Sequence, residues 1–149
     1  MTGVRHATGT RRIIDVALRA VTAAGLLIDA IVHVQLAANY QLAAPAGIGQ
    51  GNLFRIEAVF AIVALLLVLA HGSRTAYLVA FSVAAGGLGA ILLYRYYQIP
   101  AIGPIPAMYE PVWFLKKSLS AVSEAIATVT AVIGFLGAGQ STPSTVPNH

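Results

Sequence analysis

An aspartate and a histidine lie four residues apart inside an apolar stretch of the chain, DAIVHVQLAANY at residues 29–40. Because an α-helix has about 3.6 residues per turn, Asp29 and His33 share one face if this stretch is helical. An ionisable side chain inside a membrane is costly unless it is paired, hydrated or neutralised. The pair therefore predicts a buried polar site, which needs compensating groups from other parts of the chain.

The composition indicates that this site lies in a membrane protein. Of the 149 residues, 58% are hydrophobic and only 9% are charged, and the mean hydropathy is +0.79. Soluble domains have about a quarter charged residues. The net charge of +4 comes from nine Lys and Arg that mostly flank apolar stretches, which favours the lipid bilayer over nucleic acid as a partner. The absence of cysteine excludes disulfides, thiolate metal sites and c-type haem attachment.

Four apolar stretches are long enough to span a bilayer. We expect an all-α integral membrane four-helix bundle with spans at about residues 13–37, 53–71, 75–94 and 112–136. One transmembrane domain, residues 13–137, then lies between an N-terminal tail, 1–12, and a disordered C-terminal tail, 138–149. The tight turn at 71–74 makes the second and third spans an antiparallel hairpin. Pro111 fits the first position of the fourth helix.

The flanking positive charges bear on the orientation of the bundle. Four basic residues flank each side, namely Arg5, Arg11, Arg12 and Arg74 on the N-terminal side and Arg55, Arg95, Lys116 and Lys117 on the other. The basic cluster before the first span usually weighs most. We therefore expect a multi-pass protein of the plasma membrane with both termini in the cytoplasm.

Acidic side chains from other spans are expected at the level of the Asp29 and His33 pair. With a rise of about 1.5 Å per residue, His33 and Glu124 lie about 10 Å below the outer helix ends, and Glu57 lies about 6 Å below them. Arg55 or Arg95 would balance the carboxylates from the rim, and the proline-rich loop from Pro100 to Pro111 would form a roof. The residues expected in the ligand-binding site are Asp29, His33, Glu57, Glu124, Arg55, Arg95, Tyr40, Tyr109, Trp113 and Lys117.

Several interpretations of this site stay open. His33, Glu57 and Glu124 could hold a divalent cation, because imidazole and carboxylate ligands suit hard or borderline metals. The site could instead bind a small polar or lipidic ligand, or its ion pairs could only fix helix packing. A haem bridging His33 and His71 is disfavoured, since antiparallel spans separate the two by roughly 15 to 20 Å. The sequence has no GxSxG, HExxH, P-loop or GxGxxG motif, and we assign no catalytic residue.

Three classes of function fit such a chain. The first is a small membrane protein that binds a ligand at an outward-facing site. The second is a structural or accessory subunit of a larger membrane complex or of a homo-oligomer, in which Gly86, Gly87 and Gly89 of the third span would face a partner helix. The third is a metalloenzyme embedded at the outer leaflet.

Three stretches of the chain carry a family resemblance. They are His33 and Tyr40 closing the first span, GNLFRIEA opening the second, and IGPIPAMYEPVWFLKKSLSAVSEAIA leading into the fourth. In these stretches the chain resembles an uncharacterised family of small four-span integral membrane proteins of high-GC Gram-positive bacteria. The resemblance covers most of residues 13–137 and implies no activity. It draws attention to His33, Glu57, Tyr109, Glu110, Pro111, Trp113, Lys117 and Glu124.

Overall fold

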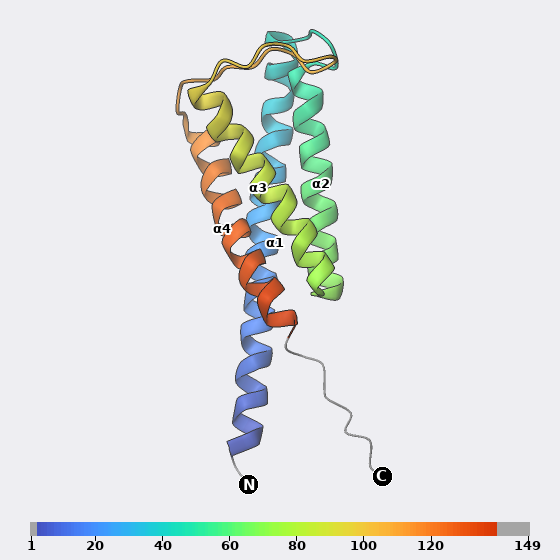
Figure 1. Cartoon of the computed structure of the whole chain (residues 1–149), viewed down its shortest axis with the longest axis vertical. Helices are drawn as coiled ribbons and strands as arrows, with labels where there is room; N and C mark the ends of the chain where they lie inside the picture. Colours follow the sequence, from blue (N-terminus) through green and yellow to red (C-terminus); the bar gives the residue numbers. More distant parts are fainter. Residues whose placement is uncertain (1–2, 140–149) are drawn as a thin grey trace.

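The computed structural model describes residues 3–139, with side chains from residue 9 onward. It contains four α-helices, α1 (Gly3–Ala43), α2 (Gln50–His71), α3 (Arg74–Tyr96) and α4 (Leu115–Ala138) (Figure 1). All four are long and apolar enough to cross a membrane, and the described residues form no strand. The predicted all-α four-helix bundle is confirmed.

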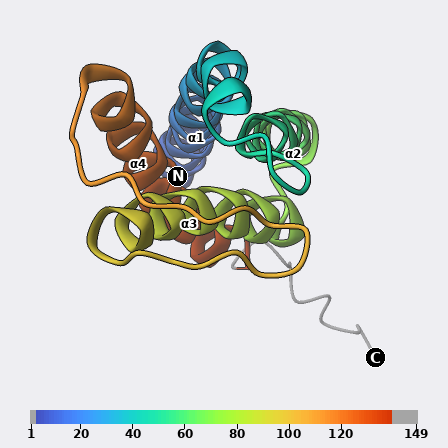
Figure 2. The same cartoon turned by 90° about the horizontal axis from the view of Figure 1, so that it is seen from above.

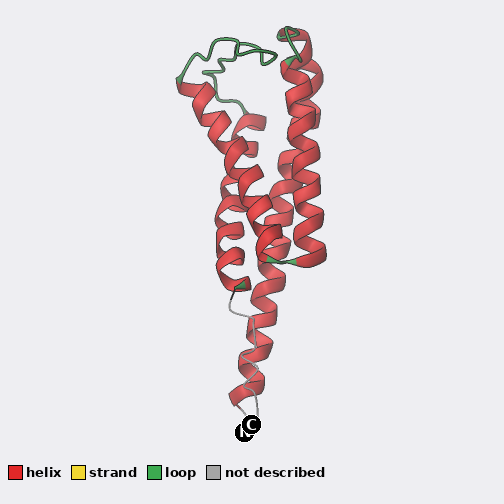
Figure 3. Ribbon diagram, turned by 45° about the vertical axis from the view of Figure 1, so that its right-hand side comes forward, coloured by secondary structure: helices red, strands yellow, loops and turns green. Residues whose placement is uncertain are grey.

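The four helices do not all pack against one another to the same extent. α1 packs against both α2 and α4, and α3 packs mainly against α4. α1 and α3 therefore lie diagonally opposite each other (Figure 2). The connections 44–49 and 97–114 lie at one end of the bundle, here called the loop end (Figure 3). The other end, at which α2 and α3 are joined, is called the hairpin end, and the first turns of α1 project beyond it (Figure 1).

The turn between α2 and α3 lies where the sequence places it. Gly72 follows the last residue of α2 with φ at 54°, the left-handed conformation that favours glycine. Ser73 then caps α3, because its side chain accepts a hydrogen bond from the backbone N–H of Ala76. These two residues fix the antiparallel α2–α3 hairpin.

The other two helices differ from the predicted spans. α1 includes residues 3–12 of the segment expected as an N-terminal tail and continues to Ala43, where the approach of Pro45 ends it. α4 begins at Leu115, so Pro111 is not its first residue, and Phe114 precedes the helix in an extended conformation. Residues 140–149 of the expected C-terminal tail lie outside the described residues.

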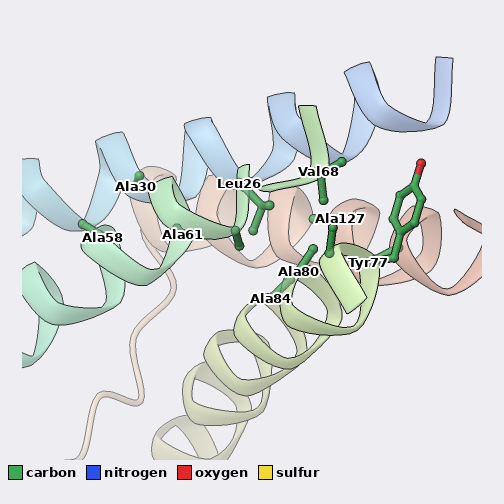
Figure 4. Packing of buried hydrophobic residues seen from close by; sticks show 12 residues of the cluster. Leu26, Ala30, Ala58, Ala61, Val68, Tyr77, Ala80, Ala84 and Ala127 are labelled. Atoms are coloured by element: carbon green, nitrogen blue, oxygen red, sulfur yellow. The ribbon is translucent and has the colours of Figure 1, made fainter. Parts of the chain in front are cut away.

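Small side chains make most of the contacts between helices. The buried alanines include Ala30, Ala58, Ala61, Ala64, Ala80, Ala84, Ala127 and Ala131 (Figure 4). Leu26, Val68 and Tyr77 fill the remaining volume, and Gly134 leaves room for the Tyr77 ring, which a Cβ at that position would overlap. Larger apolar residues such as Leu66 point outward. Close helix packing by small residues with a bulky apolar exterior is typical of membrane bundles.

The proline-rich loop folds over the loop end as a short hairpin. Two pairs of its residues form isolated β-bridges, Ile99 with Met108 and Ile102 with Ile105. The N–H of Ile48 donates to the carbonyl of Pro104 at 2.9 Å, and the N–H of Glu110 donates to the carbonyl of Tyr94 at 2.9 Å. The proline-rich loop is thus attached to the loop at residues 44–49 and to the end of α3, and it forms a roof over the bundle.

Candidate metal centre

Asp29, His33 and Glu124 meet inside the bundle. α1 supplies Asp29 and His33 one turn apart, and α4 supplies Glu124 from the facing side. His33 Nδ1 lies 2.9 Å from Asp29 Oδ1, and the three residues are 0%, 8% and 1% exposed. One possible ligand atom from each residue lies within 4.8 Å of those of the other two. The three side chains could therefore contact one metal ion together.

Ser120 connects α4 to this group. Its Oγ donates a hydrogen bond to Asp29 Oδ1 at 2.7 Å and lies 3.5 Å from Glu124 Oε1. A hydroxyl has only one proton to donate. Ser120 donates it in the shorter contact, to Asp29, so the contact with Glu124 contributes little stabilisation. Ser120 was not among the residues expected in the site. Its spacing of four residues from Glu124, which puts both on one helix face, could have indicated it.

Glu57 approaches the same group from α2, beside a glycine of α3. A Cβ added at Gly87 would overlap Glu124 Oε1 and lie 3.3 Å from Glu57 Oε1. The two carboxylates thus occupy the space that a side chain at Gly87 would need. The expected metal ligands were His33, Glu57 and Glu124, whereas the structure groups Asp29 with His33 and Glu124 and places Glu57 next to them.

Three carboxylates of the site keep an oxygen without a partner. Asp29 Oδ2, Glu57 Oε1 and Glu124 Oε2 are all buried and form no hydrogen bond to any described residue. Leaving a buried polar atom unsatisfied costs about 1–3 kcal/mol, and such atoms are few in native proteins. Three of the chain's five acidic residues thus gather around one imidazole. The site can accept positive charge, as a cation or as protons.

The arginines expected to balance this charge do not reach it. Arg55 is exposed and donates to Asn52 Oδ1 at 2.5 Å. The Arg95 guanidinium lies over the rings of Tyr96 and Trp113, 5.5 and 6.0 Å from their centres. Within residues 9–139, no ion pair joins an arginine to the buried glutamates. The predicted charge balance is wrong, because both arginines lie near helix ends, where long side chains extend toward the boundary.

Two other residues expected in the site, Tyr40 and Lys117, attach the roof to the helices. The hydroxyl of Tyr40 donates to Glu110 Oε2 at 2.9 Å, and Lys117 Nζ donates to the carbonyl of Glu110. Lys117 Nζ also lies 5.4 Å from the centre of the Trp113 ring. Trp113 and Tyr109 are exposed. Tyr40 and Lys117 thus hold the roof against the helices, whereas Tyr109 and Trp113 lie outside the buried site.

A cavity of about 300 Å³ lies between the roof and the buried group. Its walls are mostly apolar and include Phe54, Phe60 and Ile91. Polar side chains line it at two levels, with Glu57 and Ser120 from the buried site and Tyr40, Glu110 and Lys117 from the roof. The cavity therefore extends from the loop end of the bundle to Glu57 and Ser120, while Asp29, His33 and Glu124 lie behind these two residues and do not line it.

His71 lies far from His33. It is the last residue of α2, at the hairpin end, and it is exposed. The His33 ring instead packs edge-on against Phe54 near the first turn of α2, with 5.1 Å between ring centres. The rise of the α-helix puts Phe54 and His71 about 25 Å apart. One haem iron therefore cannot bind both imidazoles.

We expect Tyr40→Phe to loosen the roof. The substitution removes the hydrogen bond to Glu110 and keeps the ring, and a bond to a carboxylate at a half-buried position contributes about 1 kcal/mol. Hydrogen exchange in residues 97–114 should become faster than in the parent protein. Tyr109→Phe is the matched control, because the Tyr109 side chain is exposed. Equal exchange in the two variants would contradict the assigned role of Tyr40.

The donor set of the site is one imidazole, carboxylate oxygens and a neighbouring hydroxyl. Imidazole suits zinc and iron, and carboxylates suit manganese and magnesium, so the mixture fits a borderline divalent cation such as Mn²⁺, Fe²⁺ or Zn²⁺. The geometry and the unpartnered oxygens are compatible with such an ion. Comparison of the chain with models of known protein families, with curated proteins and with solved structures finds no match.

Proposed function

We propose that the chain is a multi-pass plasma-membrane protein that binds one divalent cation between Asp29, His33 and Glu124. The observation that supports this most is the set of buried carboxylate oxygens without partners beside an imidazole. A cation would satisfy these oxygens and offset their charge, which no arginine in the described part of the chain does. Glu57 would add negative charge beside the ion, and Ser120 would orient Asp29.

We further propose that the loop end faces the exterior, with both termini in the cytoplasm. The cavity of about 300 Å³ then opens toward the outer side of the membrane and reaches Glu57 and Ser120, next to the three proposed ligands. Its apolar walls and polar inner end would also suit the small polar or lipidic ligand expected from the sequence. That ligand stays a prediction, as do the roles of accessory subunit and outer-leaflet metalloenzyme.

Equilibrium dialysis tests the cation site. Protein purified in mild detergent and treated with a chelator is dialysed against Mn²⁺ or Zn²⁺, and its metal content is measured by elemental analysis. We expect one ion per chain and an affinity at least about tenfold lower for Glu124→Gln, since the loss of a hydrogen-bond partner of a metal ligand already costs about 10–100-fold in metal affinity, and Glu124 is itself a proposed ligand. Asp15→Asn is the control, because Asp15 is on the same helix as Asp29 but pairs with Arg19 at 2.8 Å.

Two results would reject the cation site. One is that the parent protein binds neither Mn²⁺ nor Zn²⁺ at about one ion per chain. The other is equal affinity in the parent protein and in Glu124→Gln. If the polar group only fixes helix packing, Glu124→Gln should change stability, and the parent protein, Glu124→Gln and Asp15→Asn should all contain only background amounts of metal.

A further inference from the structure

A second cavity, of about 620 Å³, lies at the hairpin end of the bundle. It is bounded by residues 11–19 of α1, by the turn between α2 and α3, and by the last turns of α4. None of the residues of the candidate metal centre lines it. It is therefore a separate feature, and a ligand bound in it would not depend on cation binding at the other site.

The lining of this cavity is strongly basic. Four arginines contribute to it, Arg11, Arg12, Arg19 and Arg74, against one acidic side chain, Asp15. Asp15 is occupied by Arg19, with 2.8 Å between Oδ2 and Nη2. None of the chain's other four acidic residues lines the cavity. The cavity therefore has an excess of positive charge, which an anionic ligand would offset.

Two of the guanidinium groups, those of Arg19 and Arg74, pack closely against glycines at helix ends. A Cβ at Gly72, whose φ is 54°, would overlap the Arg19 guanidinium, and a Cβ at Gly139 would lie 2.7 Å from Arg74 Cζ. Arg74 also donates from Nε to the carbonyl of Phe135 at 3.4 Å and lies 4.7 Å from the centre of its ring. Arg19 Nε is buried without a hydrogen-bond partner. The two charges are thus positioned at the cavity before any ligand binds.

Apolar side chains line the same cavity next to the arginines. They include Ile14, Leu18 and Ile133. The cavity also lies where three of the membrane-spanning helices begin or end, which is the level of lipid headgroups. Arginine binds phosphate oxygens through two parallel hydrogen bonds, and basic pockets between membrane helices bind anionic headgroups. A ligand that fits both kinds of lining has a phosphate group attached to an apolar chain.

We propose that this cavity binds the phosphate headgroup of an anionic phospholipid, with Arg19 and Arg74 as its main contacts. The acyl chains would lie along Ile14 and Ile133, outside the bundle. Free phosphate shares the headgroup chemistry but cannot use the apolar lining. A phospholipid is therefore expected to bind more tightly than inorganic phosphate.

Native mass spectrometry of the full chain in detergent tests this proposal. The protein is offered equal amounts of phosphatidylglycerol and phosphatidylcholine with identical acyl chains. We expect phosphatidylglycerol to bind at least about tenfold more tightly, and Arg19→Gln/Arg74→Gln to lower its affinity about thirtyfold. Arg55→Gln/Arg95→Gln removes the same charge at the loop end and should leave the affinity unchanged. Arg19→Lys/Arg74→Lys, which keeps the charge, should retain most of the binding.

Several outcomes would overturn the proposal. Equal binding of the two lipids by the parent protein would do so without any variant, so the test stands even if the glutamine variant does not fold. Equal losses in the two glutamine variants would show that the lipid responds to net charge and not to this cavity. Displacement of phosphatidylglycerol by an excess of inorganic phosphate would assign the cavity to free phosphate.

Discussion

Gly87→Leu is expected to lower the free energy of unfolding by about 1–3 kcal/mol and to abolish cation binding, since overpacking a closed interior costs about this much. A Cβ at Gly87 already overlaps the Glu124 carboxylate, and the Glu57 carboxylate lies 3.3 Å from it. A leucine would displace both side chains from the buried group. Unfolding in detergent and the metal content of the same samples measure the two effects.

The adjacent glycine gives a matched control for this experiment. A Cβ at Gly86 meets no atom within 4 Å, so Gly86→Leu places the same side chain on the outer surface of α3. Its effect on stability should stay within about 0.5 kcal/mol, and its cation affinity should equal that of the parent protein. Equal loss of stability and binding in the two variants would mean that Gly87 does not make room for the site.

Glu124→Met is expected to stabilise the cation-free protein by about 1–3 kcal/mol while it removes cation binding. Glu124 Oε2 is buried without a partner, and Glu124 Oε1 has only the 3.5 Å contact with Ser120. Methionine fills a similar volume without an unsatisfied polar atom. A gain in stability that is coupled to a loss of binding is the pattern of a residue retained for function.

Glu110→Met is the contrasting variant. Glu110 is also a glutamate near the cavity, but its carboxylate accepts the hydrogen bond of Tyr40 and its backbone carbonyl accepts from Lys117. Removing its carboxylate should lower stability and leave cation binding intact. Unfolding of chelator-treated samples compares the two variants. If Glu124→Met also lowers the stability of the cation-free protein, the buried group has a structural role and the functional interpretation fails.

The membrane-spanning segments could be predicted from the sequence because hydropathy marks them directly. The end of α2 and the start of α3 could be predicted too. Gly72 favours the end of a helix, and Ser73 favours the start of the next one. The full length of α1 could not, because hydropathy shows where a chain can cross a membrane and not where its backbone stops being helical. The helix continues on both sides of the apolar stretch, from Gly3 to Ala43.

The level of the site in the bundle could be predicted, but the rotation of each helix about its axis could not. Depth along the helices indicated that Asp29, His33 and Glu124 could meet, and they do. Depth does not say which way Arg95 points, and its guanidinium lies over aromatic rings instead of beside a carboxylate. Gly87 was likewise grouped with its neighbours as a surface for a partner helix, whereas it faces the interior.

Pulsed electron paramagnetic resonance of the Mn²⁺-loaded protein tests the central claim most directly. An imidazole nitrogen bound to Mn²⁺ gives a characteristic modulation of the electron spin echo. We expect this nitrogen modulation in the parent protein and in Asp15→Asn, and we expect it to vanish in His33→Gln. Mn²⁺ that shows no nitrogen modulation in the parent protein, or the same modulation in His33→Gln, would contradict a cation held by Asp29, His33 and Glu124.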